Sequence, residues 1–262
     1  MKISTCYNYK PIYRQPAFGS TCRYYVTPNG KEIGNNTWIL REDLEWKRLT
    51  EFEIGHFKDK EKVNIIQFAS SDGSEGYTKI MSLLNNRHHK DVEKFFPIMA
   101  YDIDDHIICK ANSKHLSLSD KDIERMKANN IDFRKYFTRR DIYSDPTNPH
   151  YRYLKSNPDI LLGPLESFKV SEDLTSKIKF QIGDMFELLP KIKDEGNTIL
   201  MCRNILGYFK NPEIESFVQE AGKVLKPGSL LEIGFLEQST PIKKYLDNNS
   251  FLKVMKNVFL KV

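Results

Sequence analysis

The stretch Val63–Thr78, VNIIQFASSDGSEGYT, decides the fold. Its first six residues form a mostly apolar, β-prone run without glycine or proline, which predicts a strand buried on both faces. Small and polar residues follow in Ala69–Ser74, and a helical pattern of apolar residues begins at Tyr77. In α/β proteins, a strand, a tight loop and a helix in this order present backbone N–H groups to nucleotide-like ligands. Many such turns bind nothing, so a plain α/β turn is the alternative interpretation.

The composition indicates an ordinary globular protein. The 262 residues suffice for one large domain, and 40% hydrophobic with 29% charged residues is typical of soluble proteins. No apolar run approaches the roughly 20 residues that span a bilayer, and Met1–Lys10 lacks the apolar core of a signal peptide. We therefore expect a cytoplasmic protein without membrane insertion.

Cysteine spacing and charge argue against a metal site and a nucleic-acid partner. The four cysteines show no spacing typical of metal ligands, so reduced thiols and no metal are predicted: Cys6, Cys22, Cys109 and Cys202. The net charge of +5 is mild and dispersed, which does not indicate nucleic-acid binding. The basic run Arg134–Arg140, RKYFTRR, is interpreted as a solvated face with two packed rings rather than a polyanion site.

Turn signals divide the chain. In residues 1–34, an Asn29-Gly30 turn between Cys22–Val26 and Glu32-Ile33 predicts a small hairpin in an N-terminal extension. Residues 35–262 are expected to form the main domain, which begins with a helix over Thr37–Leu49. The segment 131–177, rich in Tyr, Arg, Asn and Pro, is too long for a plain loop, so it is predicted to form a small inserted subdomain.

Strands and helices alternate through the rest of the main domain. After Val63–Phe68, four further strands are predicted, over Phe95–Ile103, Ile178–Ile182, Thr198–Cys202 and Leu230–Phe235. A helix over Pro212–Leu225 has proline at its start and Lys-Pro-Gly at its end, and Phe251–Val262 predicts one or two closing strands. Five strands interleaved with helices indicate a three-layer α/β sandwich.

Asp102 ends the second strand, where a Rossmann-type site binds ribose hydroxyls. It lies about 30 residues after the small-residue loop, near the spacing of one βαβ unit. The alternative is that Asp102 caps the following helix. Farther on, Ser119 and Asp122 resemble a capping box.

Five motifs in the same order resemble the CheR-type methyltransferases, a family that uses S-adenosylmethionine to methylate glutamate side chains of bacterial chemoreceptors. The segment Asn197–Phe209, NTILMCRNILGYF, is similar to that family's CRNVLIYF-like signature. An N-x-T-x-x-x-R pattern lies at Asn35–Arg41, a loop similar to T-G-E-E-P-Y at Gly73–Tyr77, and an S-D-I-D-like ribose strand at Tyr101–Asp104. The ends of the family's fifth strand unit match Leu225–Gly228 and Gly234 with Glu237. The resemblance covers roughly residues 35–240 and implies a Rossmann-like class I methyltransferase fold with a small inserted subdomain.

The resemblance also implies roles for individual residues. Arg41 and Tyr208 would flank the transferring methyl group and orient the acceptor, Glu75 would lie near the methionine ammonium, and Asp102 would hold the ribose. The implied cofactor is S-adenosylmethionine, leaving S-adenosylhomocysteine as product, and the expected cofactor-binding set is Asn35, Thr37, Arg41, Ala69, Gly73, Glu75, Asp102, Ile103, Asp184, Met185, Arg203 and Asn204.

This sequence departs from the family pattern at several positions. Ser74 and Gly76 replace an acidic residue and a proline of the loop, and Asp184-Met185 stands where the family usually has Asn-Leu. An aspartate there can still accept from the adenine amino group. Only 34 residues precede Asn35, so the family's basic, helical N-terminal domain is not expected here.

The implied chemistry agrees with the residues. A carboxylate acceptor is already ionised at neutral pH, since its reference pKa is about 4.3, and it needs no general base; no motif here is centred on histidine. We therefore expect a chemotaxis-type methyltransferase acting on a glutamate of a protein or peptide. The alternatives are a small-molecule O-methyltransferase, which the segment Gly183–Pro190 also resembles, and a non-catalytic cofactor-binding module.

Overall fold

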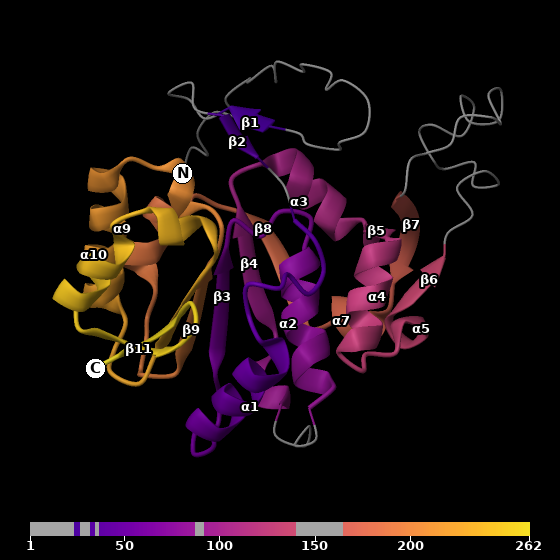
Figure 1. Ribbon diagram of the computed structural model, residues 1–262, viewed down its shortest axis with the longest axis horizontal. Coiled ribbons are helices and arrows are strands. Elements are labelled where there is room, and N and C mark those ends of the chain that lie inside the picture. Colours follow the sequence, from indigo (N-terminus) through magenta and orange to yellow (C-terminus); the bar gives the residue numbers. More distant parts are fainter. Residues whose placement is uncertain (1–23, 27–31, 35–36, 87–91, 140–164) are drawn as a thin grey trace, which may run out of the picture. The chain divides into compact units, whose positions relative to one another are not determined.

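The computed structural model describes residues 24–26, 32–34, 37–86, 92–139 and 165–262 (Figure 1). The chain divides into two compact units, Met1–Asn36 and Thr37–Val262. In the first unit, strand β1 (Tyr24–Val26) pairs antiparallel with β2 (Glu32–Gly34), with Tyr25 opposite Ile33. The turn predicted at Asn29-Gly30 lies outside the described residues.

The second unit is built on a seven-stranded mixed sheet in the order β11-β12-β10-β9-β3-β4-β8. Strands β3, β4, β8, β9 and β10 pair in parallel, whereas β12 runs antiparallel to both β10 and β11. All the predicted strands are confirmed, with bounds β3 Asn64–Phe68, β4 Ile98–Asp102, β8 Ile178–Ile182, β9 Thr198–Cys202, β10 Leu230–Ile233, β11 Phe251–Met255 and β12 Val258–Lys261.

The strand order reverses between β3 and β9. From β3 the chain moves outward to β4 and β8, and from β9 it moves outward in the other direction to β10. Because parallel crossovers are right-handed, these two halves place their helices on opposite faces of the sheet. Ligands of such sheets bind at the carboxyl ends of the strands beside this reversal. The loops after β3, β4, β8, β9 and β10 are therefore the places to look for a site.

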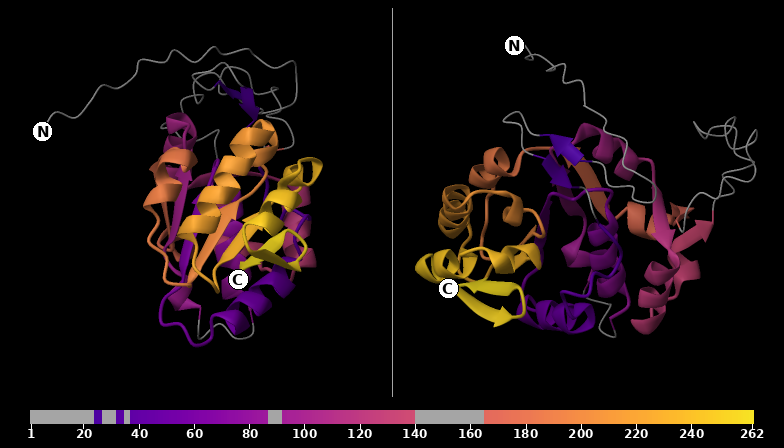
Figure 2. Two further views of the ribbon diagram at one scale, coloured as in Figure 1. Left: turned by 90° about the vertical axis from the view of Figure 1, so that its left-hand side faces the viewer. Right: turned by 45° about the horizontal axis from the view of Figure 1, so that its top comes forward.

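Two groups of helices cover the sheet. Helices α1 and α2 pack against each other, and so do α9 and α10 (Figures 1 and 2). The α-helices are α1 Trp46–His56, α2 Ser74–Leu84, α3 Asp105–Asn112, α4 Asp120–Ala128, α5 Phe133–Tyr136, α7 Glu172–Thr175, α8 Met185–Leu188, α9 Asn211–Val224 and α10 Ile242–Asn248. Short 3-10 turns are η2 Glu93–Phe95, η3 Leu189–Lys191, η4 Leu206–Tyr208 and η5 Leu236–Ser239. The predicted three-layer α/β sandwich is confirmed.

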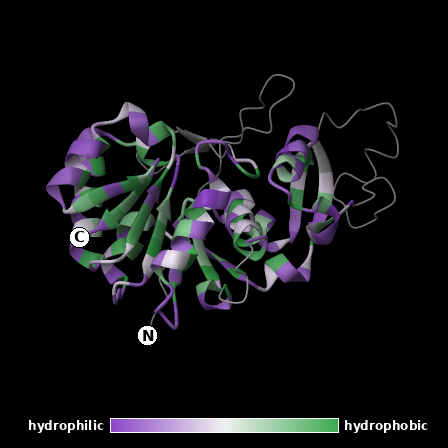
Figure 3. Ribbon diagram, turned by 60° about the horizontal axis from the view of Figure 1, so that its bottom comes forward, coloured by the Kyte–Doolittle hydropathy of each residue, from purple (hydrophilic) through white to green (hydrophobic). Residues whose placement is uncertain are grey.

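The core lies between the sheet and these helices. Hydrophobic residues concentrate along the central strands (Figure 3). All five residues of β9 are buried, whereas Asn64 and Ile66 of β3 are only partly buried. The strand that is buried throughout is thus β9 rather than the β3 strand from which the fold was predicted. No helix in the described part of the chain is long and apolar enough to cross a membrane.

The helix predicted over Thr37–Leu49 is wrong in its first half. Residues 37–45 form turns, and α1 begins at Trp46. Leu40 has φ +50°, a left-handed conformation that a helix cannot continue through. The indole N–H of Trp46 donates to the carbonyl oxygen of Arg41 at 2.9 Å. The turns thereby carry Arg41 and Asp43 into buried positions.

A separate three-stranded antiparallel sheet has the order β5-β7-β6, with β5 His115–Ser119, β6 Phe137–Arg139 and β7 Leu165–Val170. Strand β5 precedes the interval 131–177 in which the small subdomain was expected, and residues 140–164 of that interval lie outside the described residues. The capping box of Ser119 and Asp122 is confirmed at the start of α4. In the basic run, Tyr136 and Phe137 are buried while Arg134 and Lys135 are exposed, as predicted.

A fully buried charge triad joins α1, α2 and β10. The ammonium of Lys79 donates to a carboxylate oxygen of Glu53 and, at 2.7 Å, to one of Glu232, and all three side chains are 0% exposed. Burial raises the pKa of Glu53 well above its usual range. Burial would also raise the pKa of Glu232, but the nearby Lys79 and Arg203 cations lower it. Of the two carboxyl groups facing Lys79, Glu53 is therefore the one more readily protonated, and Glu232 is the one that the cations favour in its ionised form.

This difference predicts unequal costs for two similar substitutions. Because the pKa of Glu53 is raised, Glu53→Gln should remove less charge from Lys79 than Glu232→Gln does, so we expect its free energy of unfolding to change by less than about 1 kcal/mol. Glu232→Gln leaves the buried Lys79 cation without an ionised partner, so a loss of about 3–5 kcal/mol is expected. Urea denaturation at pH 7 measures both. Glu220→Gln, in an exposed pair with Lys223, is the control and should change nothing measurable. Equal losses in the two buried variants would contradict the assignment of the proton.

Candidate active site

The loop after β3 is a strained turn that only small side chains fit. Ala69, Ser71 and Gly73 all have positive φ, of 53°, 50° and 92°. A Cβ atom at Gly73 would lie 2.6 Å from Cζ of Phe180, so this position requires glycine sterically as well as conformationally. The loop turns the chain directly into α2 and leaves the N–H groups of the first helical turn at the carboxyl edge of the sheet.

Asp102 closes this loop from the neighbouring strand. Its carboxylate accepts hydrogen bonds from the backbone N–H of Ser71 at 2.8 Å and of Asp104 at 3.0 Å. Helix α3 is capped by Asp104, which accepts from the N–H groups of His106 and Ile107. The interpretation of Asp102 as the helix cap is therefore wrong. Burial raises the pKa of Asp102 to about 6, although its backbone hydrogen bonds act in the opposite direction.

Four charged side chains cluster at the ends of β3 and β9. The Glu75 carboxylate lies 3.4 Å from Nε of Arg41 and 3.5 Å from Nη1 of Arg203, and Arg203 also donates to Asp43 at 2.5 Å. Arg41, Asp43, Glu75 and Arg203 expose 8%, 8%, 6% and 4% of their surface. Burial alone would lower the pKa of Arg203, but Glu75 and Asp43 raise it above its usual value. The structure thus brings together three of the residues expected from the sequence.

Two tryptophans support the arginines of this cluster. The guanidinium carbon of Arg41 lies 4.1 Å from the ring centroid of Trp38, and that of Arg203 lies 4.9 Å from that of Trp46. When a guanidinium group lies over an aromatic face, the N–H donors in the plane of the guanidinium group can still reach other partners. Asp43, Trp38 and Trp46 were not expected at the site. Their closeness to Arg41 in the sequence is the only signal that could have indicated them.

The cluster fits the amino-acid end of S-adenosylmethionine. Glu75 Oε1 and Arg203 Nη1 are buried, and although they are ion-paired, neither makes a hydrogen bond within the described part of the chain. The same holds for the buried hydroxyl of Ser70 in the loop after β3. Buried polar atoms are normally hydrogen-bonded. A ligand ammonium suits the carboxylate and a ligand carboxylate suits the guanidinium, and the methionine end of the cofactor carries both groups.

The loop after β9 is fixed by Glu237. The buried carboxylate of Glu237 accepts from the backbone N–H groups of Asn204, Ile205, Leu206 and Gly234, at 2.8–3.1 Å. Burial raises the pKa of this carboxyl despite those hydrogen bonds. The four hydrogen bonds tie the loop after β9 to the loop after β10.

The side chain of Asn204 also holds the backbone of the loop after β10, a role that the sequence did not predict. Its side-chain oxygen accepts from the backbone N–H groups of Phe235 and Leu236, while its Nδ2 has no hydrogen-bond partner among the described residues. Tyr208, expected to orient the acceptor, is half-buried on η4, in the same loop as Arg203 and Asn204.

The remaining expected residues lie at the edges of the site. Asp184 caps α8 by accepting from the N–H of Phe186 at 2.8 Å, and Met185 is buried with its sulfur 4.0 Å from that of Cys202. Ile103 and Thr37 are half-buried, the former between Asp102 and Asp104. Asn35 lies outside the described residues.

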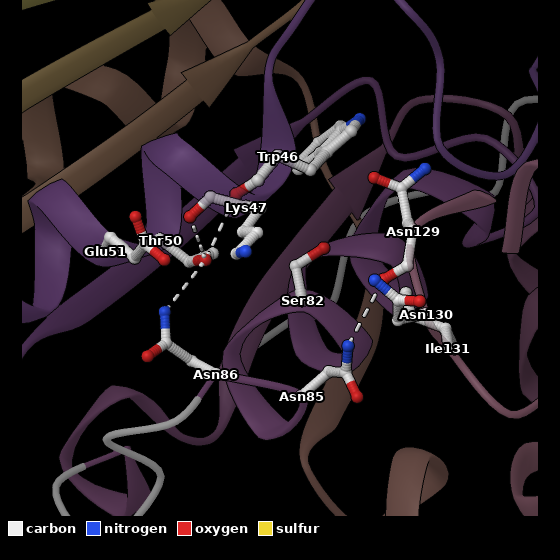
Figure 4. A pocket seen from close by; sticks show the side chains of 10 residues that line it. All are labelled: Trp46, Lys47, Thr50, Glu51, Ser82, Asn85, Asn86, Asn129, Asn130 and Ile131. Carbon is white, nitrogen blue, oxygen red and sulfur yellow. Dashed lines mark hydrogen bonds between the residues drawn. The ribbon is translucent and has the colours of Figure 1, made fainter. Parts of the chain in front are cut away.

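A polar cavity of about 290 Å³ lies elsewhere, between α1, the end of α2 and the turn after α4 (Figure 4). It is lined by Trp46, Lys47, Thr50, Glu51, Ser82, Asn85, Asn86, Asn129, Asn130 and Ile131. Asn85 and Asn129 end helices α2 and α4 and are joined by a hydrogen bond of 3.3 Å. Because helix ends rather than the carboxyl ends of strands form it, we assign it no part in cofactor binding.

The sheet order, the strained loop and the buried acidic residue at the end of β4 are those of a Rossmann-like class I methyltransferase that binds S-adenosylmethionine. The chain belongs to the CheR methyltransferase family, whose model "CheR methyltransferase, SAM binding domain" matches residues 35–254.

Individual relatives are distant. "Chemotaxis protein methyltransferase 2" of Vibrio cholerae serotype O1 is 23% identical over 223 residues, which are 84% of this chain and 67% of the relative. Among solved structures, magnesium protoporphyrin IX methyltransferase (ChlM) from Synechocystis PCC 6803 with bound SAM is 9% identical with a TM-score of 0.41, covering 84% of this chain and 80% of that one. Monomeric WbdD is 8% identical with a TM-score of 0.45, covering 85% and 42%.

The pKa of Asp102 predicts that cofactor binding depends on pH. The role expected for Asp102, accepting hydrogen bonds from the ribose hydroxyls, requires an ionised carboxylate, so a protein protonated at Asp102 would release a proton on binding. With a pKa of about 6 in the free protein, affinity for S-adenosylhomocysteine should be about tenfold weaker at pH 5 than at pH 7. Isothermal titration calorimetry measures both affinities. Asp102→Asn should bind more weakly at pH 7 and lose this dependence; an unchanged slope in the variant would refute the assigned role.

Proposed function

We propose that this protein transfers a methyl group from S-adenosylmethionine to the side-chain carboxylate of a glutamate in a protein or peptide. The chemistry of the two side chains expected to face the acceptor carries the proposal. Arg41 and Tyr208 would supply hydrogen-bond donors, and neither arginine nor an ordinary tyrosine acts as a base at neutral pH. An acceptor that arrives already ionised suits such a site, and a carboxylate does so.

The family and the named relative support the same reaction. The Vibrio cholerae relative is called a chemotaxis protein methyltransferase, and we extend that context to this chain as part of the proposal. At 23% identity the relative supports methyl transfer more strongly than it supports any one acceptor.

Each expected residue then has a definite task. Bound S-adenosylmethionine supplies a methyl group carried on a positively charged sulfur. Asp102 would accept from the ribose hydroxyls, Asp184 from the adenine amino group, and Glu75 from the ammonium of the methionine end. Ala69, Gly73, Ile103, Met185 and Thr37 would contact the cofactor.

The acceptor side depends on position rather than on proton transfer. Arg41 contacts both Glu75 and the Trp38 ring, so its guanidinium group has few orientations. A guanidinium fixed in this way can hold an acceptor carboxylate in line with the methyl group, and Tyr208 can donate a second hydrogen bond. Positioning of this kind contributes about 7–11 kcal/mol in well-oriented reactions.

The stability of the product to alkali tests the acceptor class. Labelled methyl groups should be transferred from the cofactor to glutamate-containing proteins or peptides, and the products then treated with mild base. A carboxyl methyl ester releases methanol under these conditions, and we expect the label to become volatile. Methyl ethers and methylamines survive the treatment. Label that stays bound would reject the carboxylate and favour a small-molecule or amine methyltransferase.

Substitution of Tyr208 tests its place in the reaction. Tyr208→Phe removes one donor to the acceptor, so kcat should fall roughly 10–100-fold, which corresponds to about 1.4–2.7 kcal/mol. Affinity for S-adenosylhomocysteine, measured by calorimetry, should stay within about twofold. Arg41→Ala should lower kcat at least as much, but it also removes a partner of Glu75 and should weaken cofactor binding. Normal turnover in a folded Tyr208→Phe variant would show that the assignment is wrong.

A further inference from the structure

Two large apolar side chains stand exposed beside the reacting end of the site. Phe235 and Leu236 follow β10 and are 60% and 36% exposed. The next residue, Glu237, is fully buried, so its charge does not reach the surface beside them. We call Phe235 and Leu236 the apolar platform.

Hydrogen bonds from a neighbouring loop hold the backbone of the platform. Asn204 Oδ1 accepts from the backbone N–H of Phe235 at 2.9 Å and of Leu236 at 3.3 Å. The residues that flank the platform bond to each other, because the carboxylate of Glu237 accepts from the backbone N–H of Gly234. A Cβ atom at Gly234 would lie 2.4 Å from Cγ of Asn204, so the two loops approach closely there. An exposed aromatic on a fixed backbone loses little conformational entropy on binding, and such residues dominate interfaces.

The platform also adjoins the loop that bears Tyr208. Turns η4 and η5 contact each other, and a Cβ atom at Gly207 would lie 3.0 Å from Cβ of Leu236. Glycine at 207 therefore allows Leu236 to pack directly against the residue that precedes Tyr208. The platform therefore lies next to the loop on which the acceptor-orienting Tyr208 is proposed.

We propose that Phe235 and Leu236 bind an apolar side chain of the acceptor peptide, a few residues from the glutamate that is methylated. This inference rests on the proposed function and adds a sequence preference to it. A free small-molecule carboxylate would not need a second contact outside the cleft, whereas a peptide continues beyond its reacting side chain. Burial of an apolar side chain on the platform would stabilise the complex without changing the reacting groups.

Direct binding tests the platform without requiring turnover. Two synthetic peptides carry glutamine in place of the acceptor glutamate, so they cannot react, and differ only in having Leu or Ser three residues away. Fluorescence anisotropy with the S-adenosylhomocysteine-bound protein should show about tenfold tighter binding of the Leu peptide. Phe235→Ala should abolish this difference. Leu252→Ala, at a comparably exposed leucine (56%) on β11, is the matched control and should preserve it.

Kinetics with the corresponding glutamate peptides separate this inference from the proposed function. We expect Phe235→Ala to raise KM for the Leu peptide about tenfold, with kcat and cofactor affinity within twofold of wild type. Methylation of both peptides with equal kcat/KM would overturn the platform while the proposed function stands. Preferential binding of the Leu peptide without methylation would support the platform and count against the function. No difference in either assay, or a Phe235→Ala effect confined to self-association in sedimentation, would overturn the inference.

Discussion

The buried carboxylate of Glu75 holds the site together, because it faces two guanidinium groups from different parts of the chain. Arg41 belongs to the turns before α1, Arg203 to the end of β9, and Glu75 itself to the first turn of α2. The three groups meet only when the central strands are in register. Since Arg203 is also paired with Asp43, breaking any one contact would leave a buried charge short of partners.

Charge balance extends from this cluster into the core. Arg203 lowers the pKa of Glu232, and Glu232 is in turn the ionised partner of Lys79. Glu53 completes the triad, and its raised pKa favours the neutral acid, which avoids two buried negative charges facing a single cation. The cofactor end of the sheet and the α1–α2 layer therefore share one electrostatic network, and substitutions in either part should be felt in the other.

A second carboxylate, Glu237, performs the corresponding task for the loops after β9 and β10. Its four backbone hydrogen bonds join the loops after β9 and β10, and Asn204 adds two more. Loops at the carboxyl ends of strands are usually the mobile part of an α/β protein. Here they form a fixed surface, which explains how Phe235 can stay exposed in a defined position.

Local sequence determined the strands, the capping box of α4, the proline start of α9 and the tight loop after β3, because alternation, apolar runs and small residues act over a few neighbours. It could not show that Thr37–Asp43 turns rather than forms a helix, since the conformation of Leu40 serves contacts made with distant residues. Nor could it show that Asp43 pairs with Arg203, 160 residues away, or that Asn204 supports Phe235. Burial and charge pairing depend on which segments the sheet order brings together. Only the tertiary structure decided those.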